Sequence, residues 1–283
     1  MYFCDGFNLH FGSFSRKTKI RPIDDIDLMI GLNGHKLYWE DNDRDYKECS
    51  IYLKSYEEPE LWRQCLNDDN SLNSTKVLNI FKSALSNISH YSNADIHRMQ
   101  QAVTLELPSY EWNFDLVPCF HTTSNVYLIP NGSGKWMKTN PEKDKELITS
   151  VNQKHSGKFL ELVRLVKYWN SKSFANKSKF QSSYLLEIML AKYYDRLYWF
   201  SDLETEFKNS LTYLYSALDI NIADPKGIEG NINRLNANEK LVLKNRICCD
   251  LIELTKANES DNIIKKFDYW KNVLGQNFPD YEV

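Results

Sequence analysis

The spacing of hydrophobic and polar residues changes once along the chain, near residue 142. Before that point, apolar residues alternate with polar ones or form short runs, and both patterns are typical of strands. One segment differs, because residues 74–88 have apolar positions three and four apart. This spacing predicts an amphipathic helix, with Ser74 as its N-cap. The predicted strands are residues 26–30, 102–107, 112–120 and 125–130.

After residue 142 the apolar residues recur at helical spacing, and Gly157 separates the first two segments. The chain therefore combines a first domain of strands and helices, residues 1–141, with a helical second domain, residues 142–283. A cleft between the two domains is expected. The predicted helices lie within residues 145–155, 158–170, 183–200, 203–218, 238–257 and 261–275.

Three carboxylates in the first domain are candidates for a metal site. Asp25 and Asp27 lie two apart at the start of a predicted strand, so they leave the same face with Cα atoms about 7 Å apart. Asp115 lies inside another predicted strand, on the face opposite its apolar neighbours. Three converging carboxylates repel one another unless cations lie between them. Mg²⁺ prefers oxygen ligands, and two such ions about 4 Å apart clamp the reacting oxygens in nucleotidyl transfer.

A Gly-Ser pair, Gly12 and Ser13, precedes these carboxylates by about a dozen residues. Glycine lets the backbone approach a phosphate closely, and the neighbouring N–H and hydroxyl groups can donate to it. Arg16 and Lys17 add positive charge. The alternative is a plain turn followed by a solvated start of a strand, since short motifs match often by chance. The conjunction of Gly-Ser, Asp-x-Asp and a third Asp favours a site for a metal-bound polyphosphate.

Composition restricts the substrates. The formal net charge is -3 and the sequence pI is about 6.1, so no global basic field is present to hold a long nucleic acid. Small substrates in a local pocket are expected. The six cysteines form no C-x-x-C pair and no zinc-site spacing, and neither a signal-peptide pattern nor an apolar stretch of about 20 residues is present. These features predict a cytoplasmic protein that is not bound to a membrane.

Several stretches, in this order, resemble the bacterial cGAS/DncV-like nucleotidyltransferases of the DNA polymerase beta-like superfamily. The resemblance extends from about residue 11 to residue 279. The stretches are "GSFSRKTKIRPIDDIDLMI", "NFDLVPCF", "GKWMKTNPEKD", "GKFLELVRLVKYWNSK", "SSYLLE", "DPKG" and "YWKNVLGQNFP". The fold that this implies is α+β: a polymerase beta-like nucleotidyltransferase core, with a mixed sheet and flanking helices, then a C-terminal helical lobe. The active site would lie in the cleft between them.

The resemblance also implies an activity. Family members join ATP and other nucleoside triphosphates into a cyclic di- or trinucleotide second messenger and release pyrophosphate, in anti-phage (CBASS) signalling. A downstream effector protein acts through the product. Two Mg²⁺ ions, or Mn²⁺ in their place, would be the cofactors, with no DNA or RNA template. A monomer is expected.

Site residues follow from the same resemblance. Asp25, Asp27 and Asp115 would bind the metals, and Asp115 would also assist deprotonation of the attacking ribose hydroxyl. The nucleotide-binding residues would be Gly12 and Ser13 at the β- and γ-phosphates, Arg16, Lys167 at the triphosphate, Ser183 at a phosphate or ribose, and Tyr184 stacked on a base. From the residues alone, Lys167 could also be a solvated helix lysine, Ser183 a helix cap and Tyr184 a core aromatic.

Family members carry a longer N-terminal helix than "MYFCDGFNLH" can form. We therefore expect this helix either to lie upstream of residue 1 or to be lost. Two other functions remain open. The same carboxylates could transfer a nucleotide to another acceptor, such as a tRNA end, a protein or a small molecule. Alternatively, the chain could bind nucleotides as a regulator without catalysis.

Overall fold

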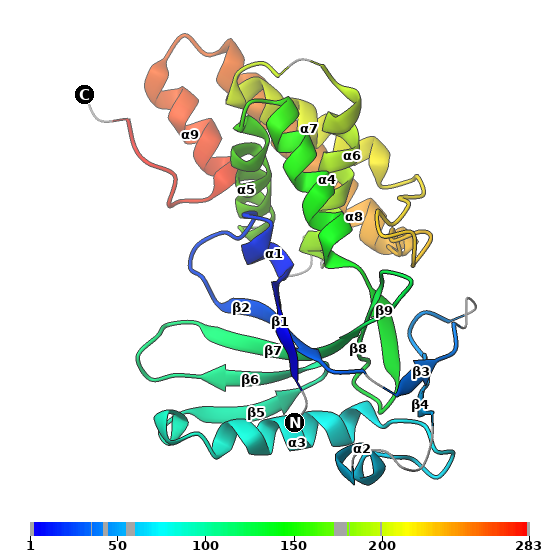
Figure 1. The fold of residues 1–283 in the computed structure, drawn as a ribbon. Coiled ribbons are helices and arrows are strands. Elements are labelled where there is room, and N and C mark those ends of the chain that lie inside the picture. The colour runs from blue at the N-terminus through cyan, green and yellow to red at the C-terminus, as the bar shows by residue number, and fades with distance from the viewer. Residues whose placement is uncertain are drawn as a thin grey trace. The chain divides into compact units, whose positions relative to one another are not determined.

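The chain divides into two compact units, Met1–Lys145 and Glu146–Val283. The boundary lies inside one helix, α4 (Pro141–Lys154). Figure 1 shows the course of the chain. The computed structural model describes residues 3–34, 36–41, 45–54, 60–172, 180, 182–198 and 200–281.

The first unit is built around a mixed sheet with strand order β1-β2-β7-β6-β5. Its central pair, β2 (Asp25–Leu32) and β7 (Asn113–His121), is parallel, and the other neighbours in this order are antiparallel. Beyond them, β8 pairs with the end of β7, and β9 pairs with β8. The four predicted strands are confirmed, as β2, β6, β7 and β8. The remaining strands are β1 (Phe3–His10), β5 (Asp95–Met99), β6 (Ala102–Glu106), β8 (Tyr127–Pro130) and β9 (Trp136–Thr139).

The two faces of the central strands differ in polarity near their N-terminal ends. Leu28 and Leu116 belong to a buried apolar cluster with residues of α3 (Ser74–Ser86), which lies along one face of the sheet (Figure 1). Because side chains alternate along a strand, Asp27 and Asp115 project from the other face. Helix α3 therefore fixes which face of the sheet carries the carboxylates.

The predicted amphipathic helix is confirmed as α3, but its predicted cap was wrong by one residue. Asn73 is the N-cap: its backbone is extended, and its side chain accepts a hydrogen bond from the Lys76 N–H at 3.0 Å. The Ser74 hydroxyl instead donates to the Lys135 carbonyl in the loop between β8 and β9. Both residue types cap helices well, so only the tertiary partner of Ser74 distinguishes them.

The sequence pattern missed several short or polar elements of the first unit. Strand β5 has the sequence DIHRM and no clear alternation, and β1 has an irregular register between Phe3 and Asn8. Other elements contain only three to five residues, too few for a periodic pattern. These are the paired strands β3 (Leu37–Trp39) and β4 (Ile51–Leu53), α1 (Gly12–Ser15), α2 (Glu60–Gln64) and the 3₁₀ helix η1 (Ser89–Tyr91).

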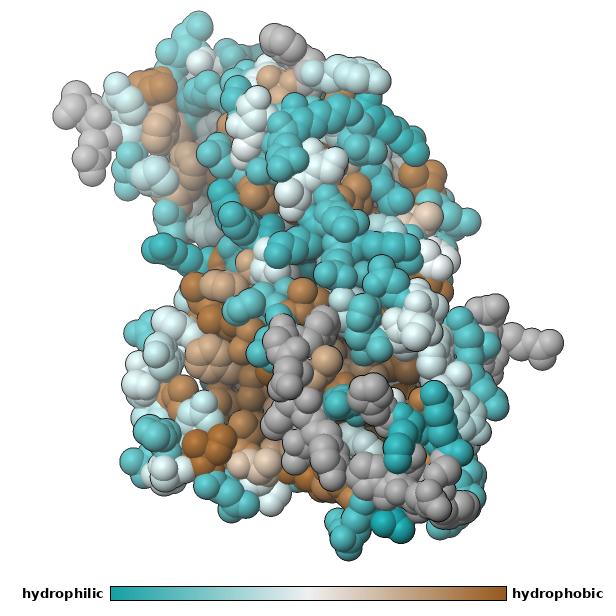
Figure 2. All heavy atoms as spheres, viewed as in Figure 1, coloured by the Kyte–Doolittle hydropathy of each residue, from teal (hydrophilic) through white to brown (hydrophobic). Residues whose placement is uncertain are grey.

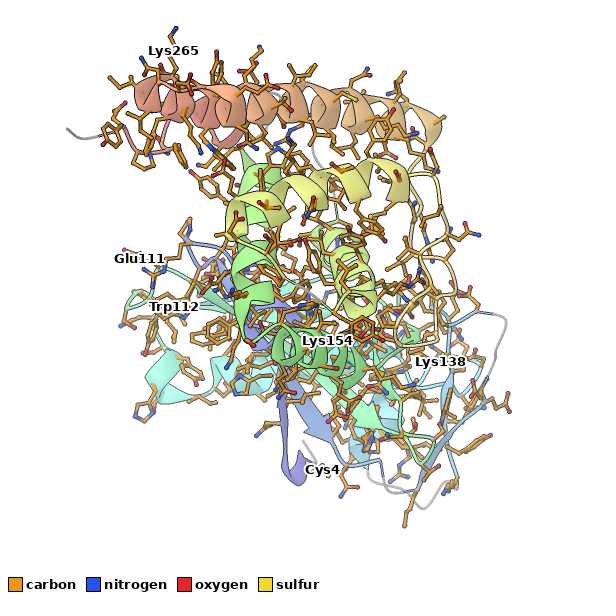
Figure 3. The ribbon with its side chains drawn as sticks, turned by 90° about the horizontal axis from the view of Figure 1, so that it is seen from above. Cys4, Glu111, Trp112, Lys138, Lys154 and Lys265 are labelled. Atoms are coloured by element: carbon orange, nitrogen blue, oxygen red, sulfur yellow. The ribbon has the colours of Figure 1, made fainter. Side chains whose placement is uncertain are left out.

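The second unit is helical, as the spacing after residue 142 predicts. Its apolar core contains Trp169, whose indole N–H donates to Asp250 at 2.6 Å while the Arg246 guanidinium lies 4.0 Å from the ring centroid. The last two helices pack side by side (Figures 1 and 3). After α4, the helices are α5 (Lys158–Ser171), α6 (Ser183–Arg196), α7 (Leu203–Ala217), α8 (Ala237–Glu259) and α9 (Ile263–Leu274).

The surface of the second unit is largely hydrophilic in the view of Figure 2. Within the part of the chain that the structure describes, none of the helices combines the length and the apolar character needed to cross a bilayer.

The cap of α3 gives a stability prediction. We expect Asn73→Ala to lower the free energy of unfolding by about 1–2 kcal/mol, because the Lys76 N–H loses its acceptor. Asn73→Asp keeps that acceptor and removes only the hydrogen bond from the Asn73 amide to Asn67. Its free energy of unfolding should therefore fall by less. Urea denaturation of the three proteins measures the difference. Equal losses in both variants would assign the effect to Asn67 and contradict the cap.

Candidate functional site

The parallel pairing of β2 and β7 brings two of the three predicted carboxylates opposite each other. In the register of this pair, Asp27 faces Asp115 and Asp25 faces Asn113. Parallel neighbours lie about 4.8 Å apart, and opposed residues project from the same face. The local sequence produces this arrangement because apolar residues follow the aspartates on both strands and hold them in the sheet.

A hydrogen bond from the next strand orients Asp115. Thr104 on β6 is opposite Asp115 in the antiparallel register, and its hydroxyl donates to Asp115 Oδ1 at 2.7 Å. The Thr104 side chain is buried. One carboxylate oxygen of Asp115 is thus fixed by a neutral donor, which leaves its second oxygen for another partner.

The Gly-Ser segment reaches Asp27 from the other side. The predicted turn is a four-residue helix, α1, which starts at Gly12 directly after β1. The Phe11 N–H donates to the Asp27 carbonyl at 3.2 Å, and Gly12 has a φ of +68°. A Cβ placed on Gly12 would lie 1.8 Å from Asp27 Oδ2. Only glycine therefore allows this backbone to lie against the Asp27 carboxylate.

The carboxylates are in an unfavourable electrostatic environment. Burial, together with the negative charges of Asp25 and Asp115, raises the pKa of Asp27 to about 6. Positive charges on Lys19 and Arg16 oppose this increase. Ionising the whole group therefore costs free energy, because the three charges repel one another at a partly buried position.

Lys19 is one of the cations that compensate this charge in the structure. Its ammonium forms ion pairs with both Asp24 and Asp25, and its side chain is mostly buried. Lys19 lies in the basic run that the sequence singles out, although Arg16 and Lys17 were considered there instead. With Thr104, it is one of two site residues that sequence reasoning missed. A polar residue in the alternating stretch AVTLEL was the available signal for Thr104.

The three aspartates offer only oxygen ligands, but their carboxylate oxygens do not all lie within 4.8 Å of one another. Among the described residues, the group whose potential ligand atoms all lie within 4.8 Å of one another is Asp95, His97 and Glu106, on β5 and β6. The two nitrogen atoms of the His97 ring lie 3.8 and 4.0 Å from carboxylate oxygens of Asp95 and Glu106. Sequence reasoning did not consider this second group.

Lys167 lies in the second unit, on α5, and is not a solvated lysine. Its ammonium is 2.7 Å from Glu187 Oε1 on α6; 6% of the lysine is exposed and none of the glutamate. Removal of one partner from a buried ion pair of this kind strongly destabilises the folded protein. The lysine thus has a structural contact whether or not it binds a phosphate.

Ser183 and Tyr184 begin α6, also in the second unit. The N-cap of this helix is Ser182, whose hydroxyl accepts from the Leu185 N–H at 3.2 Å, so the alternative that Ser183 is only a helix cap does not hold. Ser183 is exposed in the first turn. The Lys226 ammonium donates to the Tyr184 hydroxyl at 2.7 Å and lies 4.5 Å from the ring centroid. The Lys226 ammonium therefore lies at the hydroxyl end of the Tyr184 ring.

Comparisons with known proteins identify relatives over nearly the whole chain. Residues 62–152 match the Second Messenger Oligonucleotide or Dinucleotide Synthetase domain. A probable cyclic nucleotide synthase from Bacillus cereus strain VD146 is 41% identical over 281 residues, covering 96% of this chain and 82% of that protein. The cyclic AMP-AMP-AMP synthase of Acinetobacter sp. strain ATCC 27244 / 9458 is 28% identical over 288 residues, covering 95% and 71%.

Two solved structures show the same fold. Escherichia coli MS115-1 CdnC, solved with ATP, has a TM-score of 0.70 at 18% identity and covers 96% of this chain and 84% of that chain. Vibrio cholerae DncV, a cyclic AMP-GMP synthase, has a TM-score of 0.68 at 12% identity and covers 97% and 70%. These likenesses confirm the predicted α+β class, with a nucleotidyltransferase core and a C-terminal helical lobe.

The contact between Gly12 and Asp27 can be tested with a matched control. Gly230 has the same φ of +68°, but a Cβ there would meet nothing within 4 Å. At either position, the left-handed backbone conformation costs an alanine about 1–2 kcal/mol. We expect Gly12→Ala to destabilise the protein clearly more than Gly230→Ala, because only its Cβ displaces a carboxylate. Thermal and urea denaturation compare the two, and equal losses would contradict the close approach.

Proposed function

The chain belongs to the bacterial cGAS/DncV-like nucleotidyltransferases, and on that premise we propose that it joins nucleoside triphosphates into a cyclic di- or trinucleotide with release of pyrophosphate. The register that sets Asp27 opposite Asp115, with the Gly12 backbone against Asp27, carries this proposal. A parallel strand pair holding two carboxylates beside a glycine turn suits a triphosphate bound through metal ions.

Asp25, Asp27 and Asp115 would hold the divalent ions. Their oxygens fit Mg²⁺, which prefers hard oxygen ligands. The raised pKa of Asp27 indicates that nearby positive charge does not fully compensate the three carboxylates, so a bound cation would stabilise their ionised forms. Mg²⁺ bound there would neutralise the polyphosphate and lower the pKa of the attacking hydroxyl. Binding of the ion by Asp25 would replace part of its present contact with Lys19.

Residues of the first unit would then accept the proton of the attacking hydroxyl and bind the phosphates of the donor. Asp115 accepts the proton of the acceptor ribose hydroxyl, while Thr104 holds its other oxygen. The hydroxyl oxygen attacks the α-phosphorus of the donor, and pyrophosphate leaves with the electron pair of the bond that breaks. Backbone N–H groups at Gly12 and the Ser13 hydroxyl donate to the β- and γ-phosphates, where Arg16 adds positive charge. A second transfer of the same kind closes a dinucleotide ring, and a trinucleotide ring takes three transfers with three pyrophosphates released.

The second unit would contribute to nucleotide binding. We assign Lys167 to the triphosphate, Ser183 to a phosphate or ribose, and Tyr184 to base stacking through its ring, whose hydroxyl accepts from Lys226. These roles rest on the family resemblance of the surrounding stretches. On the same basis we place the product in anti-phage signalling, where a separate effector protein responds to it.

The activity and its carboxylates can be tested together. Pure protein with labelled triphosphates and Mg²⁺ should form a phosphatase-resistant product without any other acceptor, and mass spectrometry identifies it. Asp27→Asn should lower this rate by at least about 100-fold, because it removes a metal ligand. Asp24→Asn, which changes a neighbouring aspartate outside the metal site, should stay within about twofold. Product that forms only after another acceptor is added would favour the alternative transferase, and synthesis retained by Asp27→Asn would contradict the metal site.

The same variant has a defined stability signature. In EDTA at pH 7 we expect Asp27→Asn to melt at the wild-type temperature or above it, because the ionised Asp27 is unfavourable in the folded protein. Its folded pKa of about 6 lies above the ordinary aspartate pKa of 3.8. Wild-type stability should therefore rise relative to the variant as the pH falls from 7 to 4. Addition of Mg²⁺ and a non-hydrolysable triphosphate should stabilise the wild type much more than the variant.

Lys167 requires a test that separates binding from structure. Lys167→Met removes the ammonium that pairs with the buried Glu187 and should cost about 3–5 kcal/mol of stability. The double variant Lys167→Met/Glu187→Gln should recover most of that loss, because both charges of the pair are then removed. If the lysine binds the triphosphate, KM stays raised in the double variant while kcat changes less. A wild-type KM in the stable double variant would leave Lys167 a purely structural role.

A further inference from the structure

Strands β5 and β6 bring a histidine and two carboxylates together on one face of the sheet. Asp95 and His97 lie two apart on β5, and Asp95 is opposite Glu106 on β6. One nitrogen of the His97 ring and one oxygen of each carboxylate all lie within 4.8 Å of one another. The alternating residues Ile96 and Leu105 belong to the apolar packing around α3, so the three polar side chains project from the other face.

This group shares its face of the sheet with the three aspartates but lies apart from them. Strand β7 separates Glu106 on β6 from Asp25 on β2, and two strand spacings amount to about 10 Å. Asn113 lies between them: it is opposite Asp25, and its amide donates to Glu106 Oε1 at 3.4 Å. An ion held by the histidine group is therefore distinct from the ions proposed for the aspartates.

The two carboxylates of the group have little nearby positive charge. Within the part of the chain that the structure describes, neither pairs with a lysine or an arginine, whereas Asp25 pairs with Lys19. The His97 nitrogens lie 3.8 and 4.0 Å from oxygens of Asp95 and Glu106, too far for hydrogen bonds. The three side chains are 71% (Asp95), 39% (His97) and 43% (Glu106) exposed, so an ion can reach them from solvent.

The donor atoms favour Zn²⁺ over Mg²⁺. Imidazole nitrogen is a ligand that Zn²⁺ binds well, whereas Mg²⁺ prefers oxygen. Zn²⁺ sites with three protein ligands and one water are tetrahedral, with bonds of about 2.0–2.2 Å that set the ligand atoms about 3.4 Å apart. Partly exposed side chains on neighbouring strands can move the distance of about 1 Å that separates the present spacing from this one.

We propose that Asp95, His97 and Glu106 form a Zn²⁺ site, separate from the proposed Mg²⁺ site. One imidazole nitrogen and one oxygen from each carboxylate bind the ion, and water completes the tetrahedron. Because the ligands come from two strands, the bound ion links β5, the last strand in the sheet order, to β6. This binding goes beyond the proposed synthesis and does not depend on it.

Zn²⁺ alone is the probe, measured by equilibrium dialysis in excess Mg²⁺, which competes for ligands that are only oxygen. We expect saturable binding of one ion per chain. His97→Gln and Glu106→Gln should each raise the Kd at least about tenfold, since even groups that only orient a ligand contribute that much. Glu106→Gln keeps the oxygen that accepts from Asn113, so its effect reports the lost charge. Zn²⁺ should also raise the urea midpoint of the wild type more than that of either variant.

Matched variants locate the binding. His90→Gln and Glu111→Gln change an exposed histidine and an exposed glutamate outside the group (Glu111 is labelled in Figure 3), and both should leave the Kd unchanged. Asp27→Asn should also leave it unchanged. A loss in Asp27→Asn as large as in His97→Gln would place the ion on the aspartates and overturn the proposal.

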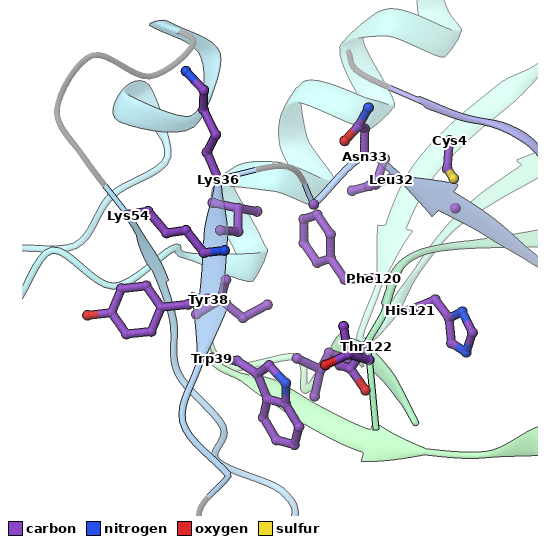
Figure 4. A pocket seen from close by; sticks show the side chains of 16 residues that line it. Cys4, Leu32, Asn33, Lys36, Tyr38, Trp39, Lys54, Phe120, His121 and Thr122 are labelled. Atoms are coloured by element: carbon purple, nitrogen blue, oxygen red, sulfur yellow. The ribbon is translucent and has the colours of Figure 1, made fainter. Parts of the chain in front are cut away.

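Cysteine is the other ligand that Zn²⁺ favours, so its contribution is tested separately. Cys4 and His121 line a cavity of about 590 Å³ at the carboxyl ends of β2 and β7 (Figure 4), and Cys248 and Cys249 are exposed on α8. Co²⁺ in place of Zn²⁺ distinguishes these positions, because a thiolate ligand adds a charge-transfer absorption band. We expect Co²⁺ to bind without this band. A thiolate band at saturation, an unchanged Kd in His97→Gln, or the absence of saturable binding would overturn the proposal.

Discussion

The parallel register of β2 and β7 is the constraint on which the site depends, because it holds like charges together against their repulsion. The two strands pair continuously from Asp25 opposite Asn113 to Gly31 opposite Cys119. Beyond the aspartates, apolar residues of both strands are buried on the two faces of the sheet, Met29 and Val117 on one and Leu116 on the other. Burial of each large apolar side chain contributes roughly 1.5–3 kcal/mol, which offsets a carboxylate repulsion of a few kcal/mol.

One stretch of chain supplies the groups that surround Asp27. The chain leaves β1, places Gly12 against the Asp27 carboxylate, and returns through Lys19 to Asp25. Nearness in sequence makes this arrangement easy to form, because closing a short loop costs little entropy. Asp115 is different, since it arrives from a strand some 90 residues later and needs the whole sheet to position it.

Local pattern predicted the parts of the site that depend on one segment. The Asp-x-Asp spacing, the apolar run after it and the alternation around Asp115 place these residues on strands and on one face. Pattern could not give the strand order that sets Asp27 opposite Asp115, or the hydroxyl of Thr104 on a third strand. It also could not show that Lys167 is buried with Glu187, because an amphipathic helix places edge lysines in water or in an ion pair with equal ease.

The direction of β1 explains why the carboxylates lie where they do. Ligands of parallel sheets usually bind at the carboxyl ends of the strands, yet Asp25 and Asp27 lie at the amino end of β2. Strand β1 is antiparallel to β2, with His10 opposite Leu28, so the carboxyl end of β1 and its Gly12 turn meet the amino end of β2. The carboxyl ends of β2 and β7 are then left for the cavity that contains Phe120. One antiparallel strand thus places the carboxylates at the amino end of β2, about 13 Å along the strand from the cavity at its carboxyl end.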